Sequence, residues 1–409
     1  MKAGWRVGSI FGIPLFLDPS WFLILIFVTL LYRSMLGPYN VTNELEWGLG
    51  FAMALLLFAS VLMHELGHSL VALSQGITVH SITLFLFGGI ASIESESKTP
   101  GQAFQVAIAG PAVSLILCLG LTLVHHISVL GEPANFMIGR LAFINLVLAI
   151  FNMMPGLPLD GGQVLKAAIW KATGNRIQGV RWSARAGEVL GWGAIALGVA
   201  LYVRTFELAF IWLAIIGWFG VQNAKTYRRV ADIQDVLLYL QASDVMRREF
   251  RVVDATLSVT EFIQQYLSVS HADILFFAAS NGRYRGQIDL DTVKTLDRSQ
   301  WDDVSLAALA VPLTRIPSVR ETTALPQVIY RLDEEQVGQI TVLSPADTVA
   351  GVIDRSDILQ QVAQALNLSI PSEIVQNVRE TQEYPTSLQL SLLAKAVLSD
   401  VKEHHQVSG

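Results

Sequence analysis

An apolar stretch of the sequence contains two histidines and a glutamate within five residues, His64-Glu65-Leu66-Gly67-His68. Positions i and i+4 lie on the same face of an α-helix, so His64 and His68 can bind one metal ion. Glu65 is rotated from them by about 100° and can hold a water molecule beside that ion. Three polar groups in an apolar helix must be compensated, which makes a chance match a poor explanation.

A zinc ion held by two histidines is one protein ligand short, because catalytic zinc usually takes three protein ligands and a water molecule. Asp160 stands out in the segment Asn152–Gly162, which reads N-M-M-P-G-L-P-L-D-G-G and directly follows a predicted helix. The prolines forbid a regular helix there, and the glycines permit close approach of the backbone. We therefore expect Asp160 on irregular backbone near the cytoplasmic edge of a bilayer, at the depth of the two histidines.

Composition indicates a membrane protein with a soluble part. The chain has 409 residues, of which 52% are hydrophobic and only 15% charged, whereas soluble domains carry roughly 25% charged residues. Residues 1–229 have a net charge of +4 and residues 230–409 a net charge of −10. The acidic second part argues against nucleic-acid binding, which needs a basic face. The single cysteine, Cys118, excludes an intrachain disulfide and a thiolate metal site.

The first part, residues 1–229, is predicted to be a polytopic α-helical membrane domain, because a spanning helix needs about 20 mostly apolar residues. About six transmembrane helices are expected, near Leu15–Leu36, Trp47–Leu73, Ala103–Val124, Met137–Met153, Glu188–Val203 and Phe206–Val221. Lysines and arginines collect on one side of these segments, eleven against three. This bias predicts that both termini and the soluble part are cytoplasmic. A multi-pass protein of a prokaryotic plasma membrane fits this compact build.

One segment of the first part, Val79–Ile93, fits neither a helix nor a plain loop. It is rich in β-branched and aromatic residues and has Gly88-Gly89 near its middle, which favours a strand or hairpin. An open strand at membrane depth must be sheltered by protein or line a wet cavity. We therefore predict a small membrane-associated β element beside the helices.

Taken together, these motifs resemble those of the site-2 proteases, a family of intramembrane zinc metalloproteases, over roughly residues 1–225. The resemblance lies in H-E-L-G-H at His64–His68, F-G-G-I at Phe87–Ile90, A-G-P at Ala109–Pro111 and N-x-x-P-x-x-P-L-D-G-G at Asn152–Gly162. It implies one zinc ion bound by His64, His68 and Asp160, with Glu65 as the catalytic base and Asn152 positioning the reacting peptide. The sequence departs from the family at Ser114, where members often have Asn, and this leaves the metal ligands untouched.

The resemblance also implies regulated intramembrane proteolysis, in which the substrate is a single-pass transmembrane protein in the lipid bilayer. A substrate helix must unwind before attack, because its amides are paired internally in lipid. We expect the Val79–Ile93 strand, with Thr83, Phe85, Gly88 and Gly89, to bind the unwound segment as an added strand. Prolines replacing Thr83 and Phe85 are then expected to reduce cleavage while zinc stays bound.

The second part contains two related units, at about residues 242–298 and 307–366. Gly286-Gln-Ile-Asp289 resembles Gly351-Val-Ile-Asp354, and each unit shows the pattern of a strand, a helix, two strands and a helix. This is similar to a tandem pair of CBS domains, a soluble α/β module that commonly binds adenine nucleotides and can form homodimers. Residues 367–409 are predicted to be a polar tail in which Ser387–Glu403 favours an amphipathic helix.

Nucleotide binding by this pair is a separate question. Asp357 matches the acidic residue with which the CBS family contacts a ribose, but Asp354 stands where the family has Ser or Thr. The first unit has Thr292 in place of the acidic residue. A structural or dimerising pair without a ligand therefore stays as open as a pair that binds an adenine nucleotide at Asp357.

Two other function classes compete with the protease. A transporter or channel gated by a CBS pair would predict a repeated set of broken helices, and only one broken segment is found, after the fourth predicted helix. A catalytically inactive scaffold is disfavoured by the intact Glu65.

Overall fold

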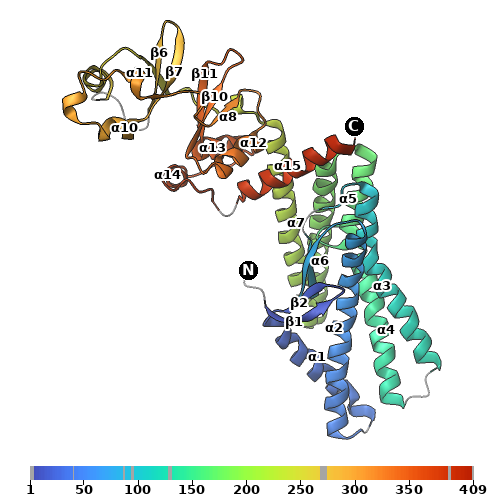
Figure 1. Cartoon of the computed structure of the whole chain (residues 1–409). Helices are drawn as coiled ribbons and strands as arrows, with labels where there is room; N and C mark the ends of the chain where they lie inside the picture. The colour runs from blue at the N-terminus through green and yellow to red at the C-terminus, as the bar shows by residue number, and fades with distance from the viewer. Residues whose placement is uncertain are drawn as a thin grey trace. The chain divides into compact units, whose positions relative to one another are not determined.

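The computed structural model divides into two compact units, Met1–Ala231 and Asp232–Gly409. The structure describes residues 4–39, 41–85, 88–93, 96–127, 131–267, 274–385 and 388–407. Long helices dominate the first unit, which we call the membrane unit, and short strands with shorter helices form the second, which we call the soluble unit (Figure 1).

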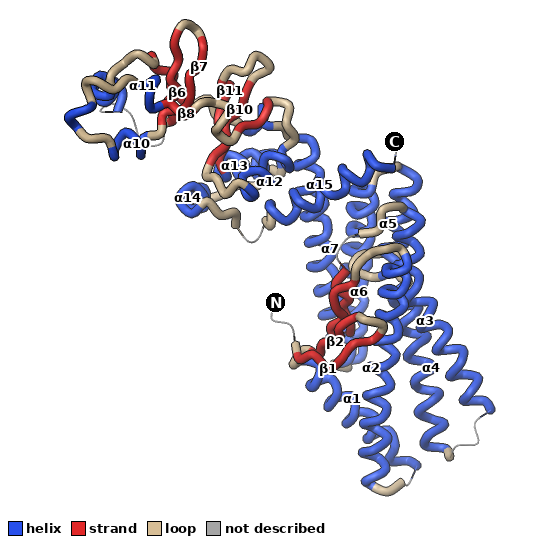
Figure 2. The backbone as a smooth tube through the Cα atoms, viewed as in Figure 1, coloured by secondary structure: helices blue, strands red, loops and turns tan. Residues whose placement is uncertain are grey.

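The membrane unit combines a helical bundle with one small sheet, whose strands are red in Figure 2. Its elements are β1 (Trp5–Ile10), β2 (Ile13–Leu17), α1 (Ser20–Leu36), α2 (Asn43–Ser74), β3 (Val79–Phe85), β4 (Gly88–Ile93), α3 (Pro100–Ile127), α4 (Glu132–Asn152), α5 (Asp160–Thr173), α6 (Arg176–Thr205) and the first part of α7 (Ala209–Tyr239), whose residues from Asp232 on belong to the soluble unit.

Five of these helices are long and apolar enough to cross a bilayer, namely α1, α2, α3, α4 and α6. Many of their large apolar side chains are exposed, among them Leu23, Ile116 and Val189, as contact with lipid requires. The sixth predicted segment, Phe206–Val221, lies mostly in α7, which is apolar in its first half and charged further on. These long apolar helices confirm the predicted polytopic membrane fold.

The first helix begins later than the sequence suggested. Leu15–Leu17 end strand β2, and α1 begins only at Ser20, after Asp18 and Pro19. Asp18 Oδ1 accepts hydrogen bonds from the backbone N–H and the hydroxyl of Ser20, at 2.9 and 2.6 Å. The predicted start near Leu15 was wrong, because a single apolar run serves both a strand and a helix.

The sheet of the membrane unit has the strand order β1-β2-β3-β4. The segment Val79–Ile93 forms the antiparallel pair β3 and β4, with Thr83 opposite Ile90. Strand β2 pairs in parallel with the other side of β3, so β3 is an inner strand and β4 an edge strand. The β1–β2 hairpin was not predicted, and Phe87 of the F-G-G-I motif lies outside the described residues.

The soluble unit contains two sheets, of strand order β5-β6-β7-β8 and β11-β10-β9. Its elements are α8 (Ala242–Val245), β5 (Phe250–Asp254), α9 (Val259–Phe262), β6 (Leu275–Ser280), β7 (Arg283–Ile288), α10 (Leu290–Thr295), α11 (Leu306–Leu309), β8 (Ala310–Val311), β9 (Ser318–Arg320), α12 (Leu325–Glu334), β10 (Gln339–Leu343), β11 (Val349–Asp354), α13 (Arg355–Ala365), α14 (Ser372–Thr381) and α15 (Leu390–Val407).

Each repeat has the predicted order of a strand, a helix, two strands and a helix, and its strands form one of the two sheets. In the first repeat, β5 and β6 are parallel and connected through α9, and β7 returns antiparallel before α10. In the second repeat, β9, α12, β10, β11 and α13 follow the same path. Gly286 and Gly351 occupy equivalent strands, β7 and β11, so the sequence repeat is also a structural repeat.

Buried apolar residues join the two repeats into one unit. Phe277 of β6 lies in a cluster with Val349 and Val352 of β11. The backbone of Arg247, which lies just before β5 of the first repeat, exchanges two hydrogen bonds of 3.0 Å with Val352 of the second. Residues 367–409 carry α14 and α15, and α15 packs against α12 with Leu390 fully buried.

Candidate active site

The side chains of His64, His68 and Asp160 converge, although almost a hundred residues separate the histidines from the aspartate. Asp160 Oδ2 lies 3.1 Å from His64 Nε2 and 3.3 Å from His68 Nε2. The two Nε2 atoms are themselves 3.3 Å apart. The three atoms therefore form a nearly equilateral triangle, contributed by α2 and by the first residue of α5.

This donor set fits a zinc ion. Ligand atoms at about 2.0–2.1 Å from a tetrahedral zinc lie roughly 3.3 Å from one another, which is the spacing of this triangle. Three such short separations cannot all be hydrogen bonds between neutral rings and one carboxylate oxygen, because each neutral imidazole has only one N–H. Two imidazoles and one carboxylate also leave the fourth position of a catalytic zinc for water.

The outer nitrogens of both rings have partners on α3. His68 Nδ1 lies 2.6 Å from the carbonyl oxygen of Val106, and His64 Nδ1 lies 2.9 Å from Ser114 Oγ. A carbonyl oxygen only accepts, so Nδ1 of His68 carries the proton and Nε2 of the neutral ring presents a lone pair to the centre of the triangle.

Gly110 of α3 makes room for both imidazoles. A Cβ atom at this position would lie 2.2 Å from His68 Nε2 and 2.7 Å from His64 Nε2. Both distances are shorter than any van der Waals contact, so the rings could not keep their positions beside a larger residue. The glycine of the A-G-P motif is therefore part of the wall of the site.

Asp160 is positioned by the irregular segment before α5 and by ion pairs behind it. The N–H of Leu157, which is almost fully buried, donates to the Ser183 carbonyl on α6 at 3.1 Å. Lys166 of α5 and Arg176 of α6 each contact Glu96 at 2.9 Å. Lys166 foremost, followed by Arg176, holds the pKa of the Glu96 carboxyl at about 2. These contacts fix α5, and with it its first residue, against α6.

Glu65 is half-buried and lies between the two histidines in sequence, facing strand β4. A Cβ atom on Gly89 would lie 2.6 Å from Glu65 Cγ, and the Glu65 carboxyl also faces the backbone amide of Ala91. The candidate base is thus in contact with the edge strand of the sheet, one residue after His64 and three before His68.

The other predicted residues occupy different places. Asn152 is the last residue of α4 and is half-buried, and its side chain makes no hydrogen bond within the described part of the chain. Thr83 and Phe85 lie in the inner strand β3, whereas Gly88 and Gly89 lie in the edge strand β4. Since β3 is paired on both sides at Thr83, an added strand cannot pair with β3 and can join this sheet only at an edge, of which β4 is the one that faces Glu65.

Sequence reasoning missed a polar contact one helical turn before the histidines. Asn145 of α4 is fully buried, and its amide donates to Ser60 Oγ of α2 at 3.0 Å and to the Leu141 carbonyl at 2.9 Å. An amide within the apolar run Leu141–Ile150 was the available signal, since such a group must find a partner in the membrane. This bond holds α4 against the helix that carries both histidine ligands.

In the soluble unit, Asp357 has two partners within the chain. Its Oδ2 accepts the backbone N–H of Asp354 at 2.9 Å and lies 3.2 Å from Arg247 Nε. Arg247 also donates to Asp354 Oδ2 at 2.7 Å. The predicted ribose contact is only 9% exposed, so a nucleotide would have to displace Arg247 to reach it.

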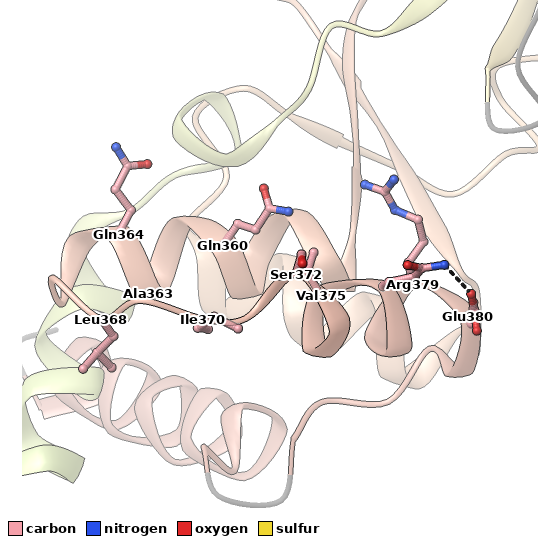
Figure 3. Close-up of a pocket in the computed structure, with 10 residues that line it drawn as sticks. Gln360, Ala363, Gln364, Leu368, Ile370, Ser372, Val375, Arg379 and Glu380 are labelled. Carbon is pink, nitrogen blue, oxygen red and sulfur yellow. Dashed lines mark hydrogen bonds between the residues drawn. The ribbon is translucent and has the colours of Figure 1, made fainter.

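An open groove of about 960 Å³ lies between α13 and α14 of the soluble unit (Figure 3). Two of its polar side chains are engaged with each other, since Gln376 donates to Glu380 at 3.0 Å. Arg379 donates to Ser356 Oγ at 3.3 Å and so turns toward the first turn of α13. The groove holds none of the predicted ligand or catalytic residues, and we place the chemistry in the membrane unit.

Comparison with known proteins gives consistent matches for the membrane unit. Residues 52–136 and 132–187 match the model of Peptidase family M50. The protein sll0528 of Synechocystis sp., named provisionally as a zinc metalloprotease, is 42% identical over 358 residues, which cover 87% of this chain and 94% of that protein.

Two solved structures are also similar to parts of the chain. The site-2 protease from Methanocaldococcus jannaschii is 28% identical with a TM-score of 0.40, and the match covers 55% of this chain and 94% of that one. The CBS domain of a bacterial CNNM/CorC family Mg²⁺ transporter is 14% identical with a TM-score of 0.29, covering 38% of this chain and 95% of that one.

Proposed function

Because the chain belongs to peptidase family M50, the site-2 zinc metalloproteases, we propose that it hydrolyses peptide bonds within the transmembrane segments of other membrane proteins. The observation that carries this proposal is the triangle of His64, His68 and Asp160, whose ligand atoms lie 3.1–3.3 Å apart in a unit built of membrane-spanning helices. Ionisable groups within membrane-spanning helices cost free energy, and for that reason they usually mark a functional site.

Each residue of the site has a definite part in this reaction. His64, His68 and Asp160 would hold a zinc ion, which when bound would supply a Lewis acid for the scissile carbonyl and would lower the pKa of a water molecule toward 7. Glu65 takes a proton from that water and delivers it to the leaving amine, which a carboxylate beside the metal can do in both directions. Asn152 is proposed to position the reacting peptide, from the end of α4.

The substrate is proposed to be a single-pass transmembrane protein whose helix unwinds at the site. Strand β4 supports this, because it is an edge strand and lies against Glu65. An extended peptide added to that edge would pair its backbone amides and would present a carbonyl near the candidate base. Of the four residues predicted for this role, Gly88 and Gly89 lie on the edge strand, and Thr83 and Phe85 support it from β3.

The edge strand can be tested through its backbone. Ala91→Pro removes the N–H that faces Glu65, and proline is tolerated on edge strands. We expect cleavage to fall at least tenfold while zinc binding is unchanged. Ala91→Val, which keeps the N–H, is the matched control. Equal cleavage by Ala91→Pro and wild type would exclude β4 as the substrate strand.

The orientation proposed for the membrane protein follows from its loop charges. Eleven lysines and arginines lie on one side of the spanning segments and three on the other. By the positive-inside rule we propose that both termini, and the soluble unit, lie in the cytoplasm, and the compact build of the chain supports a prokaryotic plasma membrane. The soluble unit should be protected from added protease in sealed right-side-out membrane vesicles and digested in inverted ones, which tests this orientation.

The soluble unit is proposed to be a CBS pair that regulates the protease, with an adenine nucleotide or a second copy of the chain as its partner. Its two strand–helix–strand–strand–helix repeats support the fold. Arg247 contacts Asp354 and Asp357, at 2.7 and 3.2 Å. Because a nucleotide would have to displace Arg247 to reach Asp357, Arg247→Gln should strengthen any binding of ATP or AMP there. Isothermal titration of the full chain with each nucleotide measures this, and no binding by either form favours a structural or dimerising pair.

The proposed function is tested by measuring zinc and cleavage together in detergent-purified protein. Wild type should bind about one zinc ion per chain and cut a generic transmembrane peptide. Glu65→Gln should keep zinc and lose cleavage, and Asp160→Ala should weaken zinc binding. A wild type without zinc, or cleavage that survives Glu65→Gln, would overturn the mechanism and make a CBS-gated transporter the working model.

A further inference from the structure

One face of α3 lies against both histidine ligands. Val106, Gly110 and Ser114 are spaced four residues apart, which places them on the same side of the helix. The Val106 carbonyl oxygen is 2.6 Å from His68 Nδ1, and Ser114 Oγ is 2.9 Å from His64 Nδ1. Gly110 lies between them, where only a hydrogen atom fits beside the two rings. A single helix face therefore contacts the outer nitrogen of each ligand.

We propose that Ser114 is a positioning residue for the metal centre. Its hydroxyl accepts the Nδ1–H of His64 and thereby directs the Nε2 lone pair of that ring toward the centre of the triangle that it forms with His68 and Asp160. The backbone carbonyl of Val106 does the same for His68. This inference rests on the proposed function, and it adds to the ligand set a side chain that touches neither metal nor substrate.

The burial of the two partners gives this hydrogen bond its strength. Ser114 is 0% exposed and His64 only 4% exposed, so water does not compete for either group. A histidine that binds a metal through one nitrogen normally donates its other N–H to an acceptor, which fixes the tautomer and the plane of the ring. Without that acceptor, the His64 ring would leave a buried N–H unpaired and would lose the preference for its present orientation.

A simpler role for the same contact is to hold α2 against α3. The two roles predict different results in folded protein. Loss of a purely structural bond would lower the stability of the helix pair and leave the zinc affinity of the folded chain unchanged. Loss of a positioning bond would weaken zinc binding in protein that is still folded. Zinc affinity, rather than cleavage, is therefore the deciding measurement.

The experiment compares Ser114→Ala with wild type in full-length, detergent-purified protein. The dissociation constant for zinc is measured by competition with a chromogenic chelator, and folding is checked by size-exclusion chromatography. We expect Ser114→Ala to bind zinc 10- to 100-fold more weakly, the range typical for partners of metal-bound histidines. With cobalt as the probe, the visible absorption bands of the variant should shift, because the ligand field changes with the orientation of the ring.

Ser183→Ala is the matched control. Ser183, on α6, is also 0% exposed, and its hydroxyl makes no hydrogen bond within the described part of the chain. We expect its zinc affinity to equal that of wild type. An equal loss in Ser183→Ala and Ser114→Ala would show that any buried serine matters through packing, and it would overturn the proposal.

A second pair of variants keeps the test decisive if Ser114→Ala does not fold. Ser114→Thr and Ser114→Val have nearly the same shape, but only the threonine retains the hydroxyl. We expect the threonine variant to bind zinc at least tenfold more tightly than the valine variant. Equal affinities in this pair, or a Ser114→Ala chain that binds zinc as well as wild type, would overturn the inference. A wild-type chain that binds no zinc would instead overturn the proposed function itself.

Discussion

Both units of the molecule bury acidic side chains, and they compensate them in opposite ways. In the soluble unit, Asp354 and Asp357 share one nearby cation, Arg247, at 2.7 and 3.2 Å. In the membrane unit, Asp160 is surrounded by two imidazoles whose Nε2 atoms point at the same oxygen. An arginine has no acceptor atoms and completes an ion pair from within the chain. Two imidazoles and a carboxylate all present lone pairs, so together they can bind a metal ion taken from solution.

The comparison teaches that the neighbours of a buried carboxylate, and not the carboxylate alone, decide what it can bind. Asp357 was predicted to contact a ribose because it matches a family motif. Its Oδ2, however, already has two partners within the chain, the backbone N–H of Asp354 and the guanidinium of Arg247. Asp160 was predicted to bind zinc from its place after a broken segment and from a family resemblance, and in the structure two imidazole nitrogens lie within 3.3 Å of its Oδ2. The predictions below test this contrast by removing either the space or the charge on which each cluster depends.

Gly110→Ala should have the most severe effect, because it removes the space for the metal ligands. A methyl group there would lie 2.2 Å from His68 Nε2 and 2.7 Å from His64 Nε2, so both rings must leave the triangle. We expect zinc affinity to fall more than 100-fold and cleavage to be lost. Gly120→Ala is the control on the same helix, since a Cβ there meets nothing within 4 Å. Retained zinc in Gly110→Ala would show that the triangle is not the metal site.

Removing the internal cation should destabilise the soluble cluster. Arg247→Met leaves Asp354 and Asp357 buried without their nearest cation, and breaking a buried ion pair in this way costs about 3–5 kcal/mol. We expect faster hydrogen exchange in the peptides that cover β11 and α13, while zinc binding in the membrane unit stays unchanged. Arg248→Met, at the exposed neighbouring position, should have no effect. Unchanged exchange in Arg247→Met would mean that Arg379, whose Nε lies 3.8 Å from Asp354 Oδ2, is cation enough for the cluster.

The same cluster should respond to pH. Burial, with the nearby Asp354 carboxylate, raises the pKa of Asp357 from 3.8 to about 6. A raised pKa means that the folded state holds the proton more firmly than the unfolded state, so stability falls as pH rises through about 6. Between pH 5 and pH 7 this amounts to about 1 kcal/mol.

Hydrogen exchange of β11 and α13, corrected for the intrinsic effect of pH on exchange rates, measures this change. Wild type should be better protected at pH 5 than at pH 7. Asp357→Asn, which cannot ionise, should show the same protection at both values. A wild type whose protection rises toward pH 7 would show that the ion pair with Arg247 outweighs the cost of burial.

The sequence allowed much of this arrangement to be predicted, for identifiable reasons. His64 and His68 share a helix face by spacing alone, so their pairing could be predicted. Asp160 was expected on irregular backbone, but it follows that proline-containing segment and is the first residue of α5. The repeats of the soluble unit were visible because glycines and aspartates recur with the same strand and helix pattern.

What the sequence could not show were contacts made by neighbours distant along the chain. Arg247 lies near the start of the first repeat but pairs with aspartates of the second, and no local pattern indicates that. The β1–β2 hairpin was hidden because its second strand shares an apolar run with α1. The contacts of Ser114 and Val106 with the two histidines depend on how α3 packs against α2, which no local sequence pattern shows. The carbonyl of Val106 has no sequence signal at all, since every residue has one.

The mildest prediction concerns the aspartate of the first repeat that corresponds to Asp354. Asp289 caps α10, where it accepts the backbone N–H of Asp291 at 3.0 Å and the hydroxyl of Thr292 at 2.7 Å. These hydrogen bonds, that of Thr292 foremost, lower the pKa of Asp289 below 3.8. Its contribution to stability is therefore fully present above pH 4 and is lost only in stronger acid.

Asp289→Ala should cost about 0.5–1 kcal/mol, the usual value for an exposed N-cap. The loss should be the same at pH 5 and pH 7, in contrast to the pH response expected at Asp357, and hydrogen exchange of α10 measures both. Asp291→Ala, next to it on the exposed face of α10, is the control and should change exchange little. A pH-dependent loss at Asp289 would show that the two repeats bury their capping aspartates alike, and that Arg247 is not what sets the second repeat apart.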